Sequence, residues 1–189
     1  MRVLRSVTLA AGFALAACSP SNDSVVLDCQ GVKHTPLVVT GDAVHIIVFL
    51  SHECPIANGY APTLRELDGK WSSDPRTSLF LVHVDPDFSV EAAIAHAKDY
   101  ELPGTILMDP KHELVRACGA TITPEAVVVS ATGIRYRGRI DDQWRKLGSR
   151  APAASQHDLL DAVANVLEGK EVAQPFPKAV GCLLPDPSR

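Results

Sequence analysis

One cysteine stands where a strand is expected to end and a helix to begin. Cys54 follows the apolar run Val44–Leu50 and directly precedes Pro55, a residue favoured at the first position of a helix. Unpaired N–H groups and the positive end of the helix dipole would face its sulfur and stabilise a thiolate. His52 would add to this effect when protonated, whereas Glu53 would oppose it. The pattern predicts an exposed, reactive thiol, with a packed structural cysteine as the alternative.

Three other cysteines follow the N-terminal region, at positions 29, 118 and 182. Their wide, irregular spacing and the lack of any CxxC motif argue against a zinc finger or zinc ribbon. Cys182 lies in a proline-rich tail, and residues 171–181 could span up to ~35 Å when extended, so this thiol can reach Cys54. A pairing of Cys182 with Cys29, or no stable disulfide, stays open.

The residues around these cysteines alternate between extended and helical patterns. Apolar, β-branched runs predict strands over 44–50, 79–84 and 105–108, and a hairpin from 126–129 and 134–140. Helices are predicted over 56–70 with a kink at Pro62, over 90–100 and over 113–119. A last helix opens at Ser155, presents one apolar face and closes at Gly169. The order predicts an α/β fold, a three-layer sandwich with a mixed central sheet.

Composition and the N-terminus narrow the class of protein. The 189 residues fit one domain, and a net charge of −4 gives no basic surface for nucleic acid. The only apolar run near membrane length is N-terminal, which excludes a polytopic membrane protein. Residues 1–17 have the pattern of a signal peptide, and the run LAAC that ends at Cys18 resembles the lipobox of bacterial lipoproteins. This resemblance implies lipidation of Cys18 and, with Ser19 after it, anchoring to the outer membrane on the periplasmic side. An ordinary secretory peptide is the alternative.

Two segments carry a wider resemblance. VFLSHECPIANGYAPTLREL resembles the active-site region of thioredoxin-fold proteins, and ATITPEAVVVSATGIRYRGRID resembles their cis-proline strand and hairpin. The resemblance implies a cis peptide bond between Thr123 and Pro124, lying against Cys54. It is closest to the redoxin branch, which includes alkyl hydroperoxide reductase/thiol-specific-antioxidant-like and thiol-disulfide oxidoreductase-like domains. The chain then divides into a lipidated cysteine and tether (18–31), a thioredoxin-like redoxin domain (32–168) and an irregular C-terminal tail (169–189).

Departures from these families limit what the resemblance implies. The second cysteine of a CxxC site would stand at Ala57, and that of a CxxxC copper site at Asn58. Ser51 matches the hydroxyl residue that peroxiredoxins have three positions before their cysteine, but Ile47 replaces their proline. A simple dithiol site is therefore excluded, and Cys54 acts alone or with a distant resolving thiol.

The resemblance also assigns roles to residues far from Cys54. A terminal Gly-Cys recurs in this group together with the CPxxN site of Cys54 and Asn58, which favours Cys182 as the functional partner. Cys118 occupies a position where this fold buries an apolar side chain, so it is interpreted as a core residue.

Charged and imidazole side chains give weaker signals. Arg135, Arg137 and Arg139 alternate on a strand, so they form either a solvated face or, as in peroxiredoxins, place one arginine near the thiolate. We take Arg137 as that candidate. His45 and His83 lie in expected buried strands and are interpreted as hydrogen-bonded core residues. His52 and Cys54 could together bind a soft metal, but two ligands alone are a weak signal for a metal site.

The expected function is that of an exported, lipid-anchored thiol oxidoreductase. Cys54 would attack a thiol or disulfide protein or a peroxide, with Cys182 or an external thiol reductant resolving the product. Thr123 and Pro124 would border the site, with Ser51, His52, Asn58 and Arg137 in support. No cofactor and no metal are expected. The alternatives are a metal-binding or cofactor-delivery module and a redox-inert adaptor.

Overall fold

The computed structural model describes residues 24–188, so the expected signal peptide and the lipidation site Cys18 lie outside the described residues. Five helices form within this range: α1 (Pro55–Gly59), α2 (Ala61–Trp71), α3 (Val90–Asp99), α4 (Glu113–Cys118) and α5 (Asp158–Leu167). The strands are β1 (Val26–Asp28), β2 (Lys33–His34), β3 (Val44–Leu50), β4 (Thr77–His83), β5 (Thr105–Met108), β6 (Ile122–Thr123), β7 (Glu125–Ser130), β8 (Gly133–Gly138), β9 (Trp144–Lys146), β10 (Ser149–Arg150) and β11 (Cys182–Leu183). No helix among them is long and apolar enough to span a membrane.

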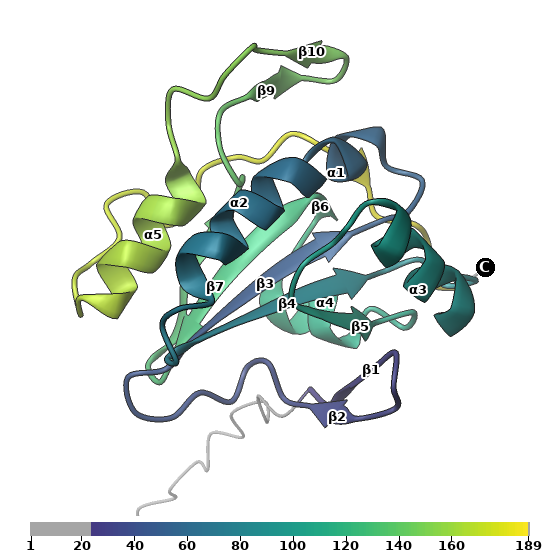
Figure 1. Cartoon of the computed structure of the whole chain (residues 1–189), viewed down its shortest axis with the longest axis horizontal. Coiled ribbons are helices and arrows are strands. Elements are labelled where there is room, and N and C mark those ends of the chain that lie inside the picture. The colour runs from purple at the N-terminus through teal and green to yellow at the C-terminus, as the bar shows by residue number, and fades with distance from the viewer. Residues whose placement is uncertain (1–23, 189) are drawn as a thin grey trace, which may run out of the picture.

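Seven strands form the central sheet, in the order β2-β1-β5-β4-β3-β7-β8. Strands β3, β4 and β5 are parallel, whereas β1 and β7 run antiparallel to their neighbours, so the sheet is mixed as predicted. Leu50 and His83 are paired at the ends of β3 and β4. The loops after these two strands therefore leave the sheet at the same edge, where Figure 1 shows α1, the helix that Cys54 directly precedes.

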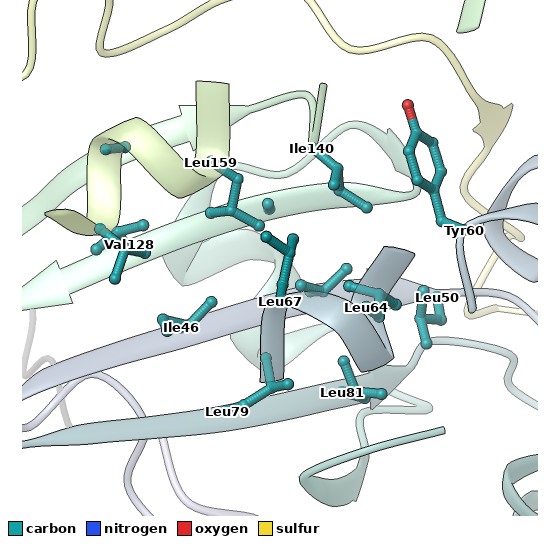
Figure 2. Packing of buried hydrophobic residues seen from close by; sticks show 14 of the residues in the cluster. Ile46, Leu50, Tyr60, Leu64, Leu67, Leu79, Leu81, Val128, Ile140 and Leu159 are labelled. Atoms are coloured by element: carbon teal, nitrogen blue, oxygen red, sulfur yellow. The ribbon is translucent and has the colours of Figure 1, made fainter. Parts of the chain in front are cut away.

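Side chains of β3 alternate between two cores, because successive residues of a strand point to opposite faces. Ile46 and Leu50 lie in a core covered by α2 and α5, and Ile47 and Phe49 lie in a second core covered by α4. Figure 2 shows the first core, in which Leu159 of α5 faces the sheet. Helices therefore cover both faces, which confirms the three-layer α/β sandwich.

Two predicted helices have different boundaries. The helix expected over 56–70 is two helices, α1 and α2, joined at Tyr60, because Pro62 lies at the start of α2 and a proline has no N–H to continue α1. The last helix begins at Asp158 and not after Ser155, whose backbone N–H and hydroxyl both donate to the carboxylate of Asp142. The remaining helices and the strands of the central hairpin agree with prediction within a few residues.

Part of the expected tether belongs to the sheet. Strand β1 lies inside the range 18–31, yet it pairs with both β2 and β5. The carboxylate of Asp28 accepts hydrogen bonds from the backbone N–H groups of Gln30 and Val32 and from His34, which closes the turn between β1 and β2. The end of the range assigned to the tether is thus the first strand of a short hairpin, whose turn is held by one carboxylate.

Two small sheets lie outside the central one. Strand β11 of the tail pairs antiparallel with β6, so the tail that was expected to be irregular contains one short strand. Strands β9 and β10 form a hairpin that projects beyond α1 and α2 (Figure 1). Neither pairing was expected from the sequence, because each strand is too short to show a period.

Leu159→Ala is expected to lower the free energy of unfolding by about 2–5 kcal/mol, because Leu159 is fully buried between α5 and the sheet. Leu147→Ala, in the turn of the projecting hairpin, should change it by less than about 0.5 kcal/mol, since Leu147 is 66% exposed. Urea denaturation followed by circular dichroism measures both values. Equal losses would contradict the packing of α5.

Candidate active site

Cys54 lies between the end of β3 and the start of α1. Its backbone N–H donates to the carbonyl oxygen of Ser51, and its sulfur accepts the N–H of Ala57 at 3.5 Å, so Cys54 is the N-cap of α1. The same sulfur donates to the carbonyl oxygen of Thr123 at 3.2 Å. The predicted position of Cys54 at a helix N-terminus is confirmed.

The prediction that Cys54 is exposed is wrong. The residue is 1% exposed, and Val180 and Cys182 of the tail pack against the cluster that contains it. A loop at the end of a parallel strand is usually open to solvent, but here a segment more than one hundred residues later in the chain lies against it. The local pattern around Cys54 carries no information about that segment.

The peptide bond between Thr123 and Pro124 is cis, as the resemblance predicted. Thr123 is fully buried, and its carbonyl oxygen is the group that the Cys54 thiol contacts. The Thr123 hydroxyl has no hydrogen-bond partner among the described residues. The strand that precedes the cis bond therefore forms one wall of the Cys54 site.

Cys182 is the second thiol of the site. In the β6–β11 pair it lies opposite Thr123, whose carbonyl oxygen also contacts Cys54. Gly181 allows this approach, because a Cβ atom there would lie 2.1 Å from the Thr123 oxygen. The Cys182 thiol interacts with the Cys54 thiol and with the backbone N–H of Ile56, so both sulfurs meet the first turn of α1.

Burial raises the pKa of Cys182 to about 12, and its hydrogen bond and charge interaction with Cys54 act in the same direction. The N–H of Ile56 opposes them with a smaller effect. Cys182 is therefore a protonated thiol at neutral pH. All four cysteines of residues 24–188 are free thiols in this structure.

The other two cysteines lie apart from this pair. Cys118 is 2% exposed, and burial raises its pKa to about 12, which agrees with its interpretation as a core residue. Cys29 follows β1 and bonds through its N–H to Ile106 of β5. Strands β5 and β4 separate β1 from β3, so the structure brings Cys54 and Cys182 together and leaves Cys29 at the far side of the sheet.

Asp85 anchors the loop that leads to Cys54. Its carboxylate accepts the hydroxyl of Ser51 at 2.6 Å and the backbone N–H of His52 at 3.0 Å. The His52 ring stacks on Phe88 with centroids 4.1 Å apart, and its Nδ1 lies 3.2 Å from the carboxylate. Ser51 and His52 are thus held by Asp85, and their role is to fix the loop next to Cys54.

Burial by itself raises the pKa of Asp85, but the His83 ring, whose Nδ1 lies 3.9 Å from the carboxylate, and hydrogen bonds from Ser51 and His52 outweigh it and hold the pKa below the ordinary value of 3.8. Sequence reasoning missed this residue. A signal was present, since Ser51 directly follows β3 and Asp85 lies two residues after the end of β4, and the ends of adjacent parallel strands meet at one edge of a sheet.

Asn58 connects α1 to its surroundings through both ends of its amide. The amide nitrogen donates to the carbonyl oxygen of His52 at 2.8 Å, so the amide oxygen faces His96 and accepts from its Nε2 at 3.0 Å. His96 packs edge-on against His83, with ring centroids 5.0 Å apart.

His83 is fully buried, but neither of its ring nitrogens has a hydrogen-bond partner within the described chain, contrary to prediction. His45 does donate to Pro36, as expected.

Arg137 is not part of the Cys54 site. Its guanidinium donates to the carbonyl oxygen of Cys118 at 3.1 Å, lies 3.9 Å from Glu125 and packs over the ring of Phe176. The neighbouring Arg135 and Arg139 pair with acidic residues of the tail and of α5. The three alternating arginines therefore make contacts that hold β8 to the tail, to α5 and to neighbouring residues.

Within residues 24–188, no three His, Cys, Asp or Glu side chains are placed to hold a metal ion.

Comparison with known proteins identifies the fold. No family model matches the chain, and no curated protein matches it. An uncharacterized conserved protein from Geobacillus kaustophilus superposes with a TM-score of 0.70 at 22% identity, over 85% of this chain and 86% of that one. A thioredoxin-like protein from Aeropyrum pernix gives 0.54 at 15% identity, over 78% and 89%. A secreted Mycobacterium tuberculosis disulfide oxidoreductase homologous to E. coli DsbE gives 0.53 at 17% identity, over 78% and 96%.

The fold is thioredoxin-like. In this thioredoxin-like chain Ala57 stands where the second cysteine of a CxxC site would be, and the thiol that meets Cys54 comes from the tail.

Gly181→Ala should expose Cys54, because the added methyl group would collide with Thr123 and separate β11 from β6. Alkylation of the tryptic peptide that contains Cys54, timed by mass spectrometry, should become about tenfold faster or more. Gly69→Ala is the matched control, since a Cβ there meets nothing within 4 Å. Unchanged alkylation in Gly181→Ala would show that the tail does not cover Cys54.

His96 makes stability depend on pH. Burial lowers its pKa to about 4, with His83 and His52 acting in the same direction, and its Nδ1 has no acceptor for a second proton within the described chain. The unfolded chain protonates this histidine near 6.5, so it binds more protons than the native state between these values. The unfolding free energy should therefore fall as pH drops from 6.5 to 4.

His96→Gln should flatten this dependence, whereas His157→Gln, an exposed residue before α5, should leave it unchanged. Urea midpoints measured across this pH range provide the comparison. The assignment of His96 fails if its replacement leaves the slope as it is in the unaltered protein.

Proposed function

We propose that this protein is a thiol-disulfide oxidoreductase whose redox pair is Cys54 and Cys182. The observation that carries the proposal is the meeting of these two thiols at the first turn of α1, beside the strand that ends in the cis bond. Cysteines at helix N-termini are favoured as thiolates, which are the nucleophiles of thiol-disulfide exchange. A thioredoxin-like fold shared with a secreted disulfide oxidoreductase agrees with this chemistry.

The cycle uses each thiol once. The first attack falls to Cys54, because its sulfur caps α1 and accepts the N–H of Ala57 at the helix N-terminus. The Cys54 thiolate attacks one sulfur of a substrate disulfide, forms a mixed disulfide and releases the other sulfur as a thiol. Cys182 then loses its proton and attacks Cys54, which releases the second substrate thiol and leaves a Cys54–Cys182 disulfide. Two electrons pass to the substrate, and an external thiol reductant returns two electrons to the pair.

Disulfide exchange fits the site better than peroxide reduction does. Peroxide reduction in the manner of peroxiredoxins would require the Ser51 hydroxyl and an arginine side chain beside the thiolate. The Ser51 hydroxyl donates to Asp85, and Arg137 lies at Cys118 and Phe176. Neither group is available to polarise a peroxide at Cys54 in this arrangement, whereas a second thiol is in place.

The N-terminal pattern gives the proposed location. Residues 1–17 have the features of a signal peptide, and Cys18 closes a lipobox-like run, so the folded domain would be held by lipid on the periplasmic side of the outer membrane. In that compartment disulfide chemistry is a common task for exported proteins.

Substitution of each cysteine tests the pair. Cys54→Ser should abolish reduction of a model protein disulfide, with a loss on the order of 10³-fold. Cys182→Ser should stop at the mixed disulfide on Cys54, and mild peroxide should leave sulfenic or sulfinic acid on Cys54 in this variant. Cys29→Ser is the matched control, because Cys29 lies on the far side of the sheet and should be dispensable.

Mass spectrometry of the unreduced protein gives a second readout. Trypsin places Cys54 and Cys182 in different peptides, so an oxidised pair appears as one crosslinked species. If the Cys54 products are the same with and without Cys182, that residue is not the resolving thiol. A Cys29–Cys182 crosslink would replace the proposed pair with a structural one.

A further inference from the structure

The β9–β10 hairpin concentrates positive charge near the two thiols. Arg145, Lys146 and Arg150 all lie between residues 143 and 150, and this segment has no acidic residue. The side chains of Arg145 and Lys146 are exposed and make no ion pair or hydrogen bond with the described residues. The chain as a whole has a net charge of −4, so this cluster is positively charged in a chain that is negatively charged overall.

A cavity of about 670 Å³ lies between this hairpin, the tail and β6. Its walls include Arg145 and Lys146 of the hairpin and Lys178 of the tail, which is also exposed and unpaired among the described residues. Two other charged residues of the wall, Arg139 and Asp142, are already hydrogen-bonded to residues of the segment from Ser155 to Asp158. Three unpaired cations therefore face a space of the size that holds a ligand.

The cavity adjoins the candidate active site. Ile122 and Gly181 line it, and the next residues along the chain are Thr123 and Cys182. Trp144, which also lines it, packs against Gly59 at the end of α1. The indole N–H of Trp144 is buried and has no acceptor among the described residues.

We propose that this cavity, lined by Arg145, Lys146 and Lys178, binds a carboxylate-rich stretch of the polypeptide whose disulfide is exchanged at Cys54. The inference rests on the proposed function and names its substrate class. Unpaired cations favour an anionic ligand, and carboxylate side chains form charge-assisted hydrogen bonds with arginine and lysine. Strand β11 lies extended beside the thiols, and Gly181 directly before it lines the cavity, so a polypeptide bound there would lie next to Cys182.

Peptide binding tests the surface without any redox step. Two synthetic peptides of equal length carry serine in place of cysteine, flanked in one by Asp and Glu and in the other by Lys. The full chain should bind the acidic peptide, quench the fluorescence of Trp144, and lose affinity as salt is added. The Lys peptide should bind at least about tenfold more weakly.

Charge reversal locates the binding site. The triple variant Arg145→Glu, Lys146→Glu, Lys178→Glu should weaken the acidic peptide by about tenfold or more. The control Lys33→Glu, Lys98→Glu, Lys111→Glu makes the same change in net charge at exposed positions that do not line the cavity, and should act within about twofold. Equal weakening by both variants would mean a general field effect and would overturn the proposal.

Three further outcomes distinguish failure of this inference from failure of the proposed function. If exchange through Cys54 and Cys182 proceeds but the acidic peptide does not bind, the surface proposal falls and the function stands. If vesicles of phosphatidylglycerol bind through the three cations while the acidic peptide does not, the ligand is a membrane surface and the proposal is overturned. If the acidic peptide binds as expected but no exchange occurs, the surface stands and the proposed function falls.

Discussion

Two residues of the tail, Cys182 and Leu183, lie hydrogen-bonded along Ile122 and Thr123. This pairing sets the composition of the site, because it delivers a second thiol to a helix that has none at its own third or fourth position. It also explains why Cys54 is buried although it stands at a loop end. A close backbone approach at Gly181 is the steric condition for both effects.

The carboxylate of Asp85 plays a comparable part on the other side of Cys54. It is nearly buried, yet its hydrogen bonds with Ser51 and His52 keep it ionised and hold the loop before the cysteine. A buried carboxylate costs free energy unless such donors surround it. The order of the loop and the charge of Asp85 therefore support each other.

Sequence reasoning succeeded where the information is local. The apolar run at 44–50 and the Cys-Pro step predict a buried strand and a helix N-terminus, and the resemblance adds the cis bond at Pro124. It failed where contacts join distant segments. The burial of Cys54 depends on the tail, and the hydrogen bonds of Arg137 depend on Cys118 and on the way the tail crosses β8.

The short strands show the same limit. A two-residue strand such as β11 has no period, and only its partner β6 defines it. Asp85 is an intermediate case. The ends of adjacent parallel strands meet at one edge of a sheet, so the predicted strands could have indicated that Asp85 lies near Ser51. Tyr60 is a second intermediate case. Pro62 predicted a break in the helix, but it could not predict that the Tyr60 hydroxyl donates to the carboxylate of Asp141. This hydrogen bond ties the junction of α1 and α2 to the loop after β8.

The great separation of the two thiols along the chain links the oxidation state of the site to the stability of the fold. In a CxxC protein the disulfide closes a loop of a few residues and hardly restricts the unfolded chain. A Cys54–Cys182 disulfide would close a loop of roughly 130 residues, for which loss of chain entropy corresponds to about 4–5 kcal/mol. By the same thermodynamic cycle, folding would make this disulfide harder to reduce by an equal free energy. The oxidised protein would then be the more heat-resistant form, and each turnover would loosen and re-tether the C-terminal tail.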